Sequence, residues 1–273
     1  MIDVQNQQDK RNIPIQKVGV KDVEIPLKLQ RKPTAGGADF TIVYAKARMS
    51  VGLPSHFKGT HMSRFMEILN DYRQEALSID DIERILFDMK KRLDATTSYL
   101  KFKFKYFIEK TAPVSGNKSV MCYDCAFEGE LDENCNLDFY IETKVPLTTL
   151  CPCSKEISDY GAHNQRAIVK AKIKYANDKN IWLEDLIKSI ESCASCEIYP
   201  LLKREDEKFV TEAAYNNPKF VEDILRDVVI EFENNDIINF YEIEVEAQES
   251  IHTHNAWAYQ KKHKQGEGQN GEF

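Results

Sequence analysis

The chain has 273 residues, of which 42% are hydrophobic and 30% are charged, and its formal net charge is −7. This composition predicts a soluble globular protein, and it disfavours a general binder of nucleic acid or of anionic membranes, because such proteins are usually basic. No stretch approaches the roughly 20 apolar residues of a membrane span, and residues 1–12 are polar and lack the apolar core of a signal peptide. We therefore expect a cytoplasmic protein whose seven cysteines are reduced thiols.

The first half of the chain combines strand-like and helix-like patterns. Apolar residues that alternate with polar ones predict strands over residues 18–29, 40–51, 99–108 and 120–130. Apolar residues at helical spacing predict helices over residues 62–76 and 82–93. The turn signal at 113–117 indicates that the last two strands form a hairpin.

The second half repeats this order of elements. The predicted strands cover residues 136–147, 167–176, 241–247 and 254–262. One helix is predicted over 183–190 and another over 220–232, with Asn217 and Pro218 in its N-cap and N1 positions. Between these two helices, the charge-rich stretch 201–212 is interpreted as a solvated loop.

The repeat of strand-strand-helix-helix-strand-strand predicts an α+β fold with two tandem modules, residues 13–135 and 136–262. Each module would be an antiparallel four-stranded sheet with both helices on one face. Residues 1–12 are expected to be flexible and residues 263–273 to form a disordered tail. Open sheet edges would remain in such a chain, and closing them into a ring across subunits is one way to satisfy them.

Two CxxC pairs, Cys122 with Cys125 and Cys193 with Cys196, raise the possibility of a four-cysteine zinc site. Local structure argues against it, because positions 122 and 125 of an alternating strand point to opposite faces. Buried thiols are the favoured interpretation of these residues.

The stretch LCPCSKEISDYGAHNQR, residues 150–166, is the part of the chain that is richest in reactive side chains. Cys151 and Cys153 are too close in sequence for an unstrained disulfide with each other. Gly161 lets the loop turn back, so that His163 can approach Cys151. A thiolate beside an imidazole suits a Zn²⁺ site or a Cys-His nucleophile pair, and an ordinary loop is the third alternative.

Two later segments supply further polar side chains. Glu222 falls in the first turn of a predicted helix, where a carboxylate stabilises the helix dipole. Glu249, His252 and His254 directly follow the predicted strand 241–247. By themselves these residues indicate neither a third metal ligand nor a substrate.

Taken in order, residues 150–166, 201–227 and 249–257 resemble the type IB GTP cyclohydrolases, and the resemblance extends over most of residues 10–262. It implies two tandem tunnelling-fold (T-fold) modules per subunit in a homotetramer, with active sites at subunit interfaces. It also implies conversion of GTP and water to 7,8-dihydroneopterin triphosphate and formate, the first step of folate biosynthesis. The divalent metal ion would be Zn²⁺ or Mn²⁺, with Fe²⁺ also possible.

The resemblance assigns roles to individual residues. The implied metal ligands are Cys151, His163 and Glu207, with Glu205 as the alternative carboxylate. The implied catalytic residues are Cys151, His163 and His252, and Glu222 would anchor the purine. Basic residues beside the motifs are candidates for binding the triphosphate: Lys155, Arg166, Lys203 and Arg204.

Two other functions remain open from the sequence. A related T-fold enzyme could act on another purine or pterin, for example a nitrile reductase with a cysteine nucleophile, although the chain has no recognisable NADPH-binding motif. A non-catalytic metal-binding module, with the Cys-Pro-Cys segment and His163 as a structural site, is the second alternative.

Overall fold

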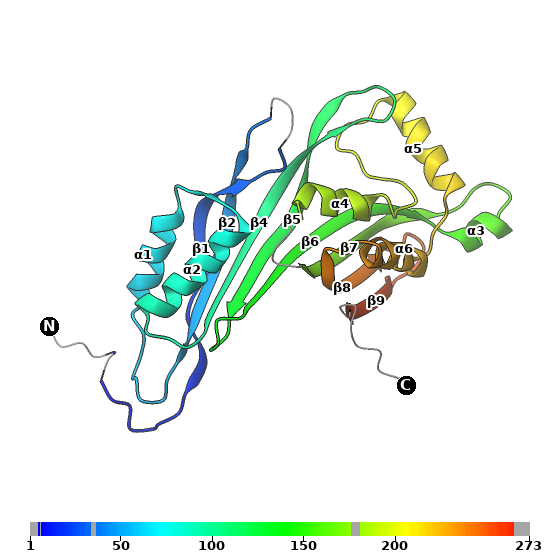
Figure 1. Ribbon diagram of the computed structural model, residues 1–273. Coiled ribbons are helices and arrows are strands. Elements are labelled where there is room, and N and C mark those ends of the chain that lie inside the picture. The colour runs from blue at the N-terminus through cyan, green and yellow to red at the C-terminus, as the bar shows by residue number, and fades with distance from the viewer. Residues whose placement is uncertain (1–4, 6, 34–36, 176–180, 265–273) are drawn as a thin grey trace. The chain divides into compact units, whose positions relative to one another are not determined.

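The computed structural model describes residues 5, 7–33, 37–175 and 181–264, and it confirms a mixed α+β architecture (Figure 1). Within these residues the chain has nine strands and six helices. It divides into two compact units, residues 1–105 with 125–141, and residues 106–124 with 142–273. Strands β4 (Ser98–Thr111), β5 (Lys118–Leu131) and β6 (Leu137–Leu150) contribute segments to both units.

The first unit is a sheet covered by two helices. Its other strands are β1 (Ile15–Gln30), β2 (Phe40–Leu53) and β3 (Ala76–Leu77), and its helices are α1 (Met62–Tyr72) and α2 (Ile79–Arg92). β2 lies between β1 and β4 and is antiparallel to both. The two helices lie side by side (Figure 1) and bury apolar residues such as Phe65 and Leu86. The predicted helical spacing over 62–76 and 82–93 thus marks the faces that form this core.

The prediction for residues 62–76 is wrong at its end. Helix α1 stops at Tyr72, and Ala76 belongs to β3, which pairs in parallel with Lys28 and Leu29 of β1. Leu77, the second residue of β3, is almost fully buried. Backbone pairing with β1 and burial of Leu77 therefore outweigh the helical spacing of Ala76.

The second unit contains the end of the β4–β5 hairpin and the strands β6, β7 (Asn164–Tyr175), β8 (Ile238–Ala247) and β9 (Ala256–His263), which are neighbours in that order. The predicted turn at 113–117 is confirmed: the Ala112 N–H donates to the Asn117 carbonyl over 2.8 Å, and Gly116 has a φ of +69°. β8 pairs antiparallel with β7 and with β9. This pairing also confirms the segment 254–262 as the partner of the strand before it.

Four helices belong to the second unit: α3 (Pro152–Ile157), α4 (Leu183–Glu191), α5 (Arg204–Asn216) and α6 (Val221–Glu233). Helix α6 packs against β8 and α4, and its buried residues include Ile224, Val228 and Phe232. The tail begins immediately after β9, where the Lys264 ammonium donates to the Phe232, Glu233 and Asn235 carbonyls. The rest of the predicted disordered tail, residues 265–273, lies outside the described residues, as do residues 1–4 and 6 of the predicted flexible N-terminus.

The interpretation of residues 201–212 as a loop is wrong, because most of this stretch forms α5. The charged residues of its first turn are exposed, with the exception of Asp206, which is fully buried. The Asp206 carboxylate accepts hydrogen bonds from the Lys203, Val114 and Ser115 N–H groups and from the Ser115 hydroxyl. These bonds anchor the start of α5 to the β4–β5 turn.

The predicted start of the last helix is also wrong. Asn217 caps the C-terminus of α5, and its side-chain amide donates to the Ala194 and Ser195 carbonyls. Helix α6 instead begins at Val221, and the Phe220 N–H donates to the Asp223 carboxylate over 3.0 Å. Asn217 and Pro218 therefore close one helix and do not open the next.

A buried ion-pair network joins the hairpin of the second unit to the end of α4. The Lys110 ammonium lies 2.8 Å from a carboxylate oxygen of Glu191 and 2.8 Å from one of Glu197. The Tyr123 hydroxyl donates to the same Glu191 oxygen over 2.7 Å. Burial raises the pKa of Glu191, and Lys110 and Tyr123 act in the opposite direction. The side chains of Lys110 and Glu191 are only 8% and 6% exposed.

The cysteines of the two CxxC pairs differ in exposure. Cys125 is buried, but Cys122 is exposed, so the interpretation as a buried thiol is wrong for Cys122; the two positions lie on opposite faces of β5. Cys193 is buried, and burial raises the pKa of its thiol to about 11. No helix among the described residues is long and apolar enough to cross a membrane.

Candidate functional site

Cys151 lies where β6 ends and α3 begins. It occupies the N-cap position of α3, and its sulfur accepts a hydrogen bond from the Ser154 N–H over 3.4 Å. Pro152 follows at the first helical position, where its fixed φ and missing N–H are tolerated. Cys151 is partly buried, whereas Cys153 on α3 is exposed.

His163 lies beside Cys151 because the loop folds back on itself. The Cys151 N–H donates to the His163 carbonyl over 3.1 Å. The Ser154 hydroxyl links the same two residues, since it donates to the Cys151 carbonyl and accepts from the His163 N–H, each over 3.2 Å. Gly161 makes the turn with a φ of +111°, a value that favours glycine. Of the three implied metal ligands, these two are held together.

The His163 ring contacts Gln165, which in turn contacts side chains from two neighbouring strand ends. Its Nδ1 lies 2.9 Å from Oε1 of Gln165, near the start of β7. The Gln165 amide nitrogen donates to the hydroxyl of Thr149 on β6 over 2.9 Å and to the carboxylate of Glu249, just after β8, over 3.4 Å. The sequence analysis did not identify Gln165 or Thr149. Strand periodicity could have indicated Gln165, because it lies two residues after His163 and on the same face as the buried Ala167.

Glu207, the third implied ligand, belongs to a different element. It lies in the first turn of α5, exposed, as does the alternative ligand Glu205. In the described part of one chain, no three His, Cys, Asp or Glu side chains come close enough together to hold a metal ion. Cys151, His163 and Glu207 therefore do not form a three-ligand set within a single described chain.

The remaining implied residues lie on several elements. Glu222 is exposed in the first turn of α6, and His252 and His254 are exposed after β8, with their rings stacked 5.2 Å apart. Lys155 on α3 donates to the Tyr215 carbonyl, and its ammonium lies 4.3 Å from the centre of the Tyr215 ring. The other three candidate triphosphate ligands are exposed: Arg166 on β7 and, at the start of α5, Lys203 and Arg204.

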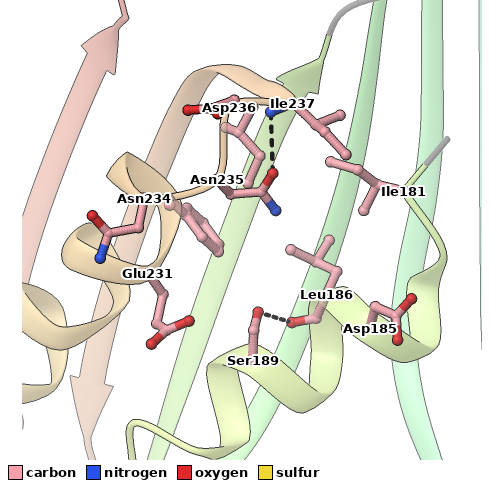
Figure 2. Close-up of a pocket in the computed structure, with 11 residues that line it drawn as sticks. Ile181, Asp185, Leu186, Ser189, Glu231, Asn234, Asn235, Asp236 and Ile237 are labelled. Atoms are coloured by element: carbon pink, nitrogen blue, oxygen red, sulfur yellow. Dashed lines mark hydrogen bonds between the residues drawn. The ribbon is translucent and has the colours of Figure 1, made fainter. Parts of the chain in front are cut away.

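A cavity of about 530 Å³ lies elsewhere in the second unit, between α4 and the C-terminal end of α6 (Figure 2). Its lining combines the buried Leu186 with the polar side chains of Asp185, Ser189 and Glu231. None of the implied site residues lines this cavity. The loop that joins Cys151 to His163 is therefore the better candidate for the functional site.

The sequence matches the type I GTP cyclohydrolase FolE2 family over residues 1–258. The chain belongs to this family. It is 52% identical over 256 residues to the GTP cyclohydrolase FolE2 of Geobacter sp. (strain M21), with 94% of this chain and 92% of that protein covered. It is 50% identical over 258 residues to the GTP cyclohydrolase FolE2 of Geobacter sulfurreducens, with 94% and 96% covered. The predicted resemblance to the type IB GTP cyclohydrolases is thereby confirmed.

Solved structures with a similar fold include urate oxidases. A urate oxidase of Bacillus sp. TB-90 gives a TM-score of 0.51 at 11% identity and covers 91% of this chain and 98% of its own. A uricase of Bacillus fastidious gives a TM-score of 0.57 at 9% identity, with 91% and 93% covered. At this level of identity the likeness concerns the fold alone, and it supports the predicted T-fold for this member of the FolE2 family.

Proposed function

We propose that the chain is a metal-dependent GTP cyclohydrolase, which converts GTP and water to 7,8-dihydroneopterin triphosphate and formate at the start of folate biosynthesis. Membership of the FolE2 family over residues 1–258 is the observation that carries this proposal. The Cys151–His163 pair supplies its chemical basis, because a sulfur ligand and an imidazole are held on one closed loop. The reaction takes place in the cytoplasm in this proposal.

Cys151 and His163 suit a divalent metal ion. Zn²⁺ is commonly bound by sulfur and imidazole, imidazole also suits Fe²⁺, and the oxygen ligand that Mn²⁺ prefers would come from Glu207. His163 also has its Nδ1 hydrogen-bonded to an amide oxygen, an arrangement that is usual for a histidine that binds a metal through its other nitrogen. When bound, the ion would supply Lewis-acid activation of the water that attacks C8 of the purine.

The third protein ligand in this proposal is Glu207, at a site that is completed by subunit assembly. Glu207 does not join Cys151 and His163 within the described part of one chain, and a site at a subunit interface accounts for this separation. The proposal accordingly includes a homotetramer. It also includes two tandem T-fold modules in each subunit, residues 13–135 and 136–262. Sedimentation velocity of the purified protein tests the tetramer, and a monomer with full activity would contradict the interfacial site.

The remaining residues would bind GTP and move protons. Guanine presents N1–H and its 2-amino group as adjacent donors, and the Glu222 carboxylate can accept from both. His252 would transfer protons during ring opening and formate release. Arg166, Lys203 and Arg204 carry exposed cationic groups that can bind the triphosphate. Lys155 would have to exchange its contact with Tyr215 for a phosphate oxygen.

The decisive experiment is incubation of the purified protein with GTP and Mn²⁺, followed by oxidation and detection of pterin fluorescence. We expect Cys151→Ala to abolish formate release while the oligomer stays intact. Cys153→Ala is the matched control, since Cys153 is an exposed cysteine two residues away, and we expect it to keep its turnover. Full turnover of the Cys151→Ala variant would contradict the role of Cys151.

The role of Glu222 has a separate test. Replacement by Gln turns one of the two acceptor oxygens into a donor, which faces a donor of guanine. We expect Glu222→Gln to lose affinity for GTP while it keeps its metal content, as measured by calorimetry and elemental analysis. Unchanged affinity for GTP would remove Glu222 from the purine site.

A further inference from the structure

Gln165 stands at the centre of a hydrogen-bonded group that has not been assigned a role. Counting two residues from the pair Ala167–Ala247 in β7 and β8 places Gln165 opposite Glu249. Counting two residues from the hydrogen-bonded pair Cys151–His163 places Thr149 opposite Gln165. Three neighbouring strand ends thus bring Thr149, Gln165 and Glu249 into one row on the same face of the sheet.

The hydrogen bonds of this row determine how the Gln165 amide is oriented. A carboxylate can only accept, so the group of Gln165 that faces Glu249 has to be its NH₂. This NH₂ group donates one hydrogen bond to the Glu249 carboxylate over 3.4 Å and one to the buried Thr149 hydroxyl over 2.9 Å. The amide oxygen then faces His163 over 2.9 Å, and it also accepts from the Ser250 hydroxyl over 3.4 Å.

The orientation of the amide in turn selects one form of the His163 ring. An amide oxygen has no proton to give, so Nδ1 of His163 has to carry the proton of this hydrogen bond. In the neutral ring, Nε2 is then left with its lone pair. The Glu249 carboxylate therefore determines, through the orientation of the Gln165 amide, which ring nitrogen of His163 carries the proton.

We propose that Gln165 is a positioning residue that holds neutral His163 in its Nδ1–H tautomer and so presents the Nε2 lone pair to an electrophile. In this scheme Glu249 acts through Gln165 and sets the direction of its amide. The purpose of this arrangement rests on the proposed function, in which the electrophile is the divalent metal ion. The tautomer itself does not depend on that function and can be measured on the metal-free protein.

The experiment is ¹⁵N NMR of the metal-free protein labelled at histidine, at a pH at which the imidazoles are neutral. The pair of ring-nitrogen signals that disappears in a His163→Gln variant belongs to His163. We expect the wild type to show a protonated Nδ1 and an unprotonated Nε2. We expect Gln165→Leu to lose this preference and to bind Zn²⁺ about 10–100-fold more weakly in competition with a chromophoric chelator.

Two further variants separate this role from a general loss of structure. In Gln165→Glu a carboxylate oxygen can still accept from Nδ1–H, so we expect the Nδ1–H tautomer to persist. Gln248→Leu makes the same substitution at a nearby residue whose side chain is exposed. Gln248 donates its backbone N–H to the Arg166 carbonyl, and the substitution leaves this bond in place. We expect this control to leave the tautomer and the Zn²⁺ affinity unchanged.

The outcomes can be distinguished from one another. A wild-type His163 with its proton on Nε2, or an Nδ1–H tautomer that persists in Gln165→Leu, would overturn the inference. If Gln165→Leu does not fold, an Nε2–H ring in Gln165→Glu would overturn it as well. A protein that shows the expected tautomers and yet releases no formate from GTP would refute the proposed function and leave the inference standing.

Discussion

Removal of the Lys110 ammonium should destabilise the second unit far more than removal of an exposed lysine. Lys110 is the cation of a pair whose side chains are 8% and 6% exposed, and it neutralises Glu191 and Glu197 together. The substitution Lys110→Met keeps an unbranched side chain of similar length and removes the charge together with the N–H donors of the ammonium group. In that variant the Tyr123 hydroxyl still donates to the buried Glu191 carboxylate.

The expected magnitude follows from the burial of the pair. Removal of one partner of a buried ion pair costs about 3–5 kcal/mol, because the other charge stays buried without compensation. Glu191 can reduce this cost by taking up a proton. Burial already raises its pKa, and loss of Lys110 removes the largest influence that lowers it. The folded variant should therefore hold a proton on Glu191 over a wider pH range than the wild type does.

The sign of the pH dependence follows from this raised pKa. A carboxyl group whose pKa is higher in the folded state adds stability at low pH, and this contribution is lost as the pH rises through the folded-state pKa. The deficit of Lys110→Met should thus be about 3–5 kcal/mol at pH 8 and at least about 1 kcal/mol smaller at pH 5. Urea unfolding followed by circular dichroism at both pH values, at one protein concentration, measures it.

The matched control is Lys208→Met on α5. Lys208 pairs with Glu212 over 3.8 Å, and the two side chains are 74% and 62% exposed. We expect this variant to stay within about 0.5 kcal/mol of the wild type at either pH. A Lys110→Met deficit below about 1 kcal/mol at pH 8, or one of equal size at both pH values, would refute the reasoning.

Two further predictions concern the packing of single residues. A Cβ at Gly19 would lie 2.0 Å from the Met49 carbonyl oxygen, so Gly19→Ala has to move β1 away from β2, and we expect a loss of about 2–3 kcal/mol in thermal unfolding. Gly59→Ala, whose nearest neighbouring atom would lie 3.6 Å away, is its control, and equal melting temperatures for the two variants would contradict the prediction. For Asp206, burial acts to raise the pKa, but the Ser115 hydroxyl and the backbone N–H groups around the carboxylate hold the pKa well below its usual range. A lowered pKa gives stability that is lost only as the pH falls through it, so hydrogen exchange at Ser115 should stay slow at about pH 4 and become fast in Asp206→Asn. Fast exchange in the wild type at that pH would count against this role of Asp206.

Much of the fold could be predicted from local sequence. Alternation over 99–108 and 120–130, with a turn signal between them, sufficed for the β4–β5 hairpin, because neighbouring segments pair without long-range information. The approach of His163 to Cys151 was predictable for the same reason. His163 follows Cys151 by only twelve positions, and Gly161 permits the turn that joins them.

Helix α5 could not be predicted in this way. Its sequence is rich in charge and carries little apolar periodicity, so its residues resemble those of a solvated loop. The start of the helix depends on Asp206, which is buried against Ser115, 91 residues earlier in the chain. A contact of this kind is made only after the hairpin and the helix have met, and no local pattern records it.

The sequence by itself determined the family, most strands and helices, and the two side chains that share the closed loop. The tertiary structure alone decided that Gln165 lies between Thr149 and Glu249, because the register of three strands sets which side chains meet, across 16 and 84 residues of sequence. It also decided that Cys151, His163 and Glu207 do not form a three-ligand set within the described chain. Side-chain chemistry can be read from a sequence, whereas the distances between groups far apart in the chain are fixed by strand pairing and helix packing.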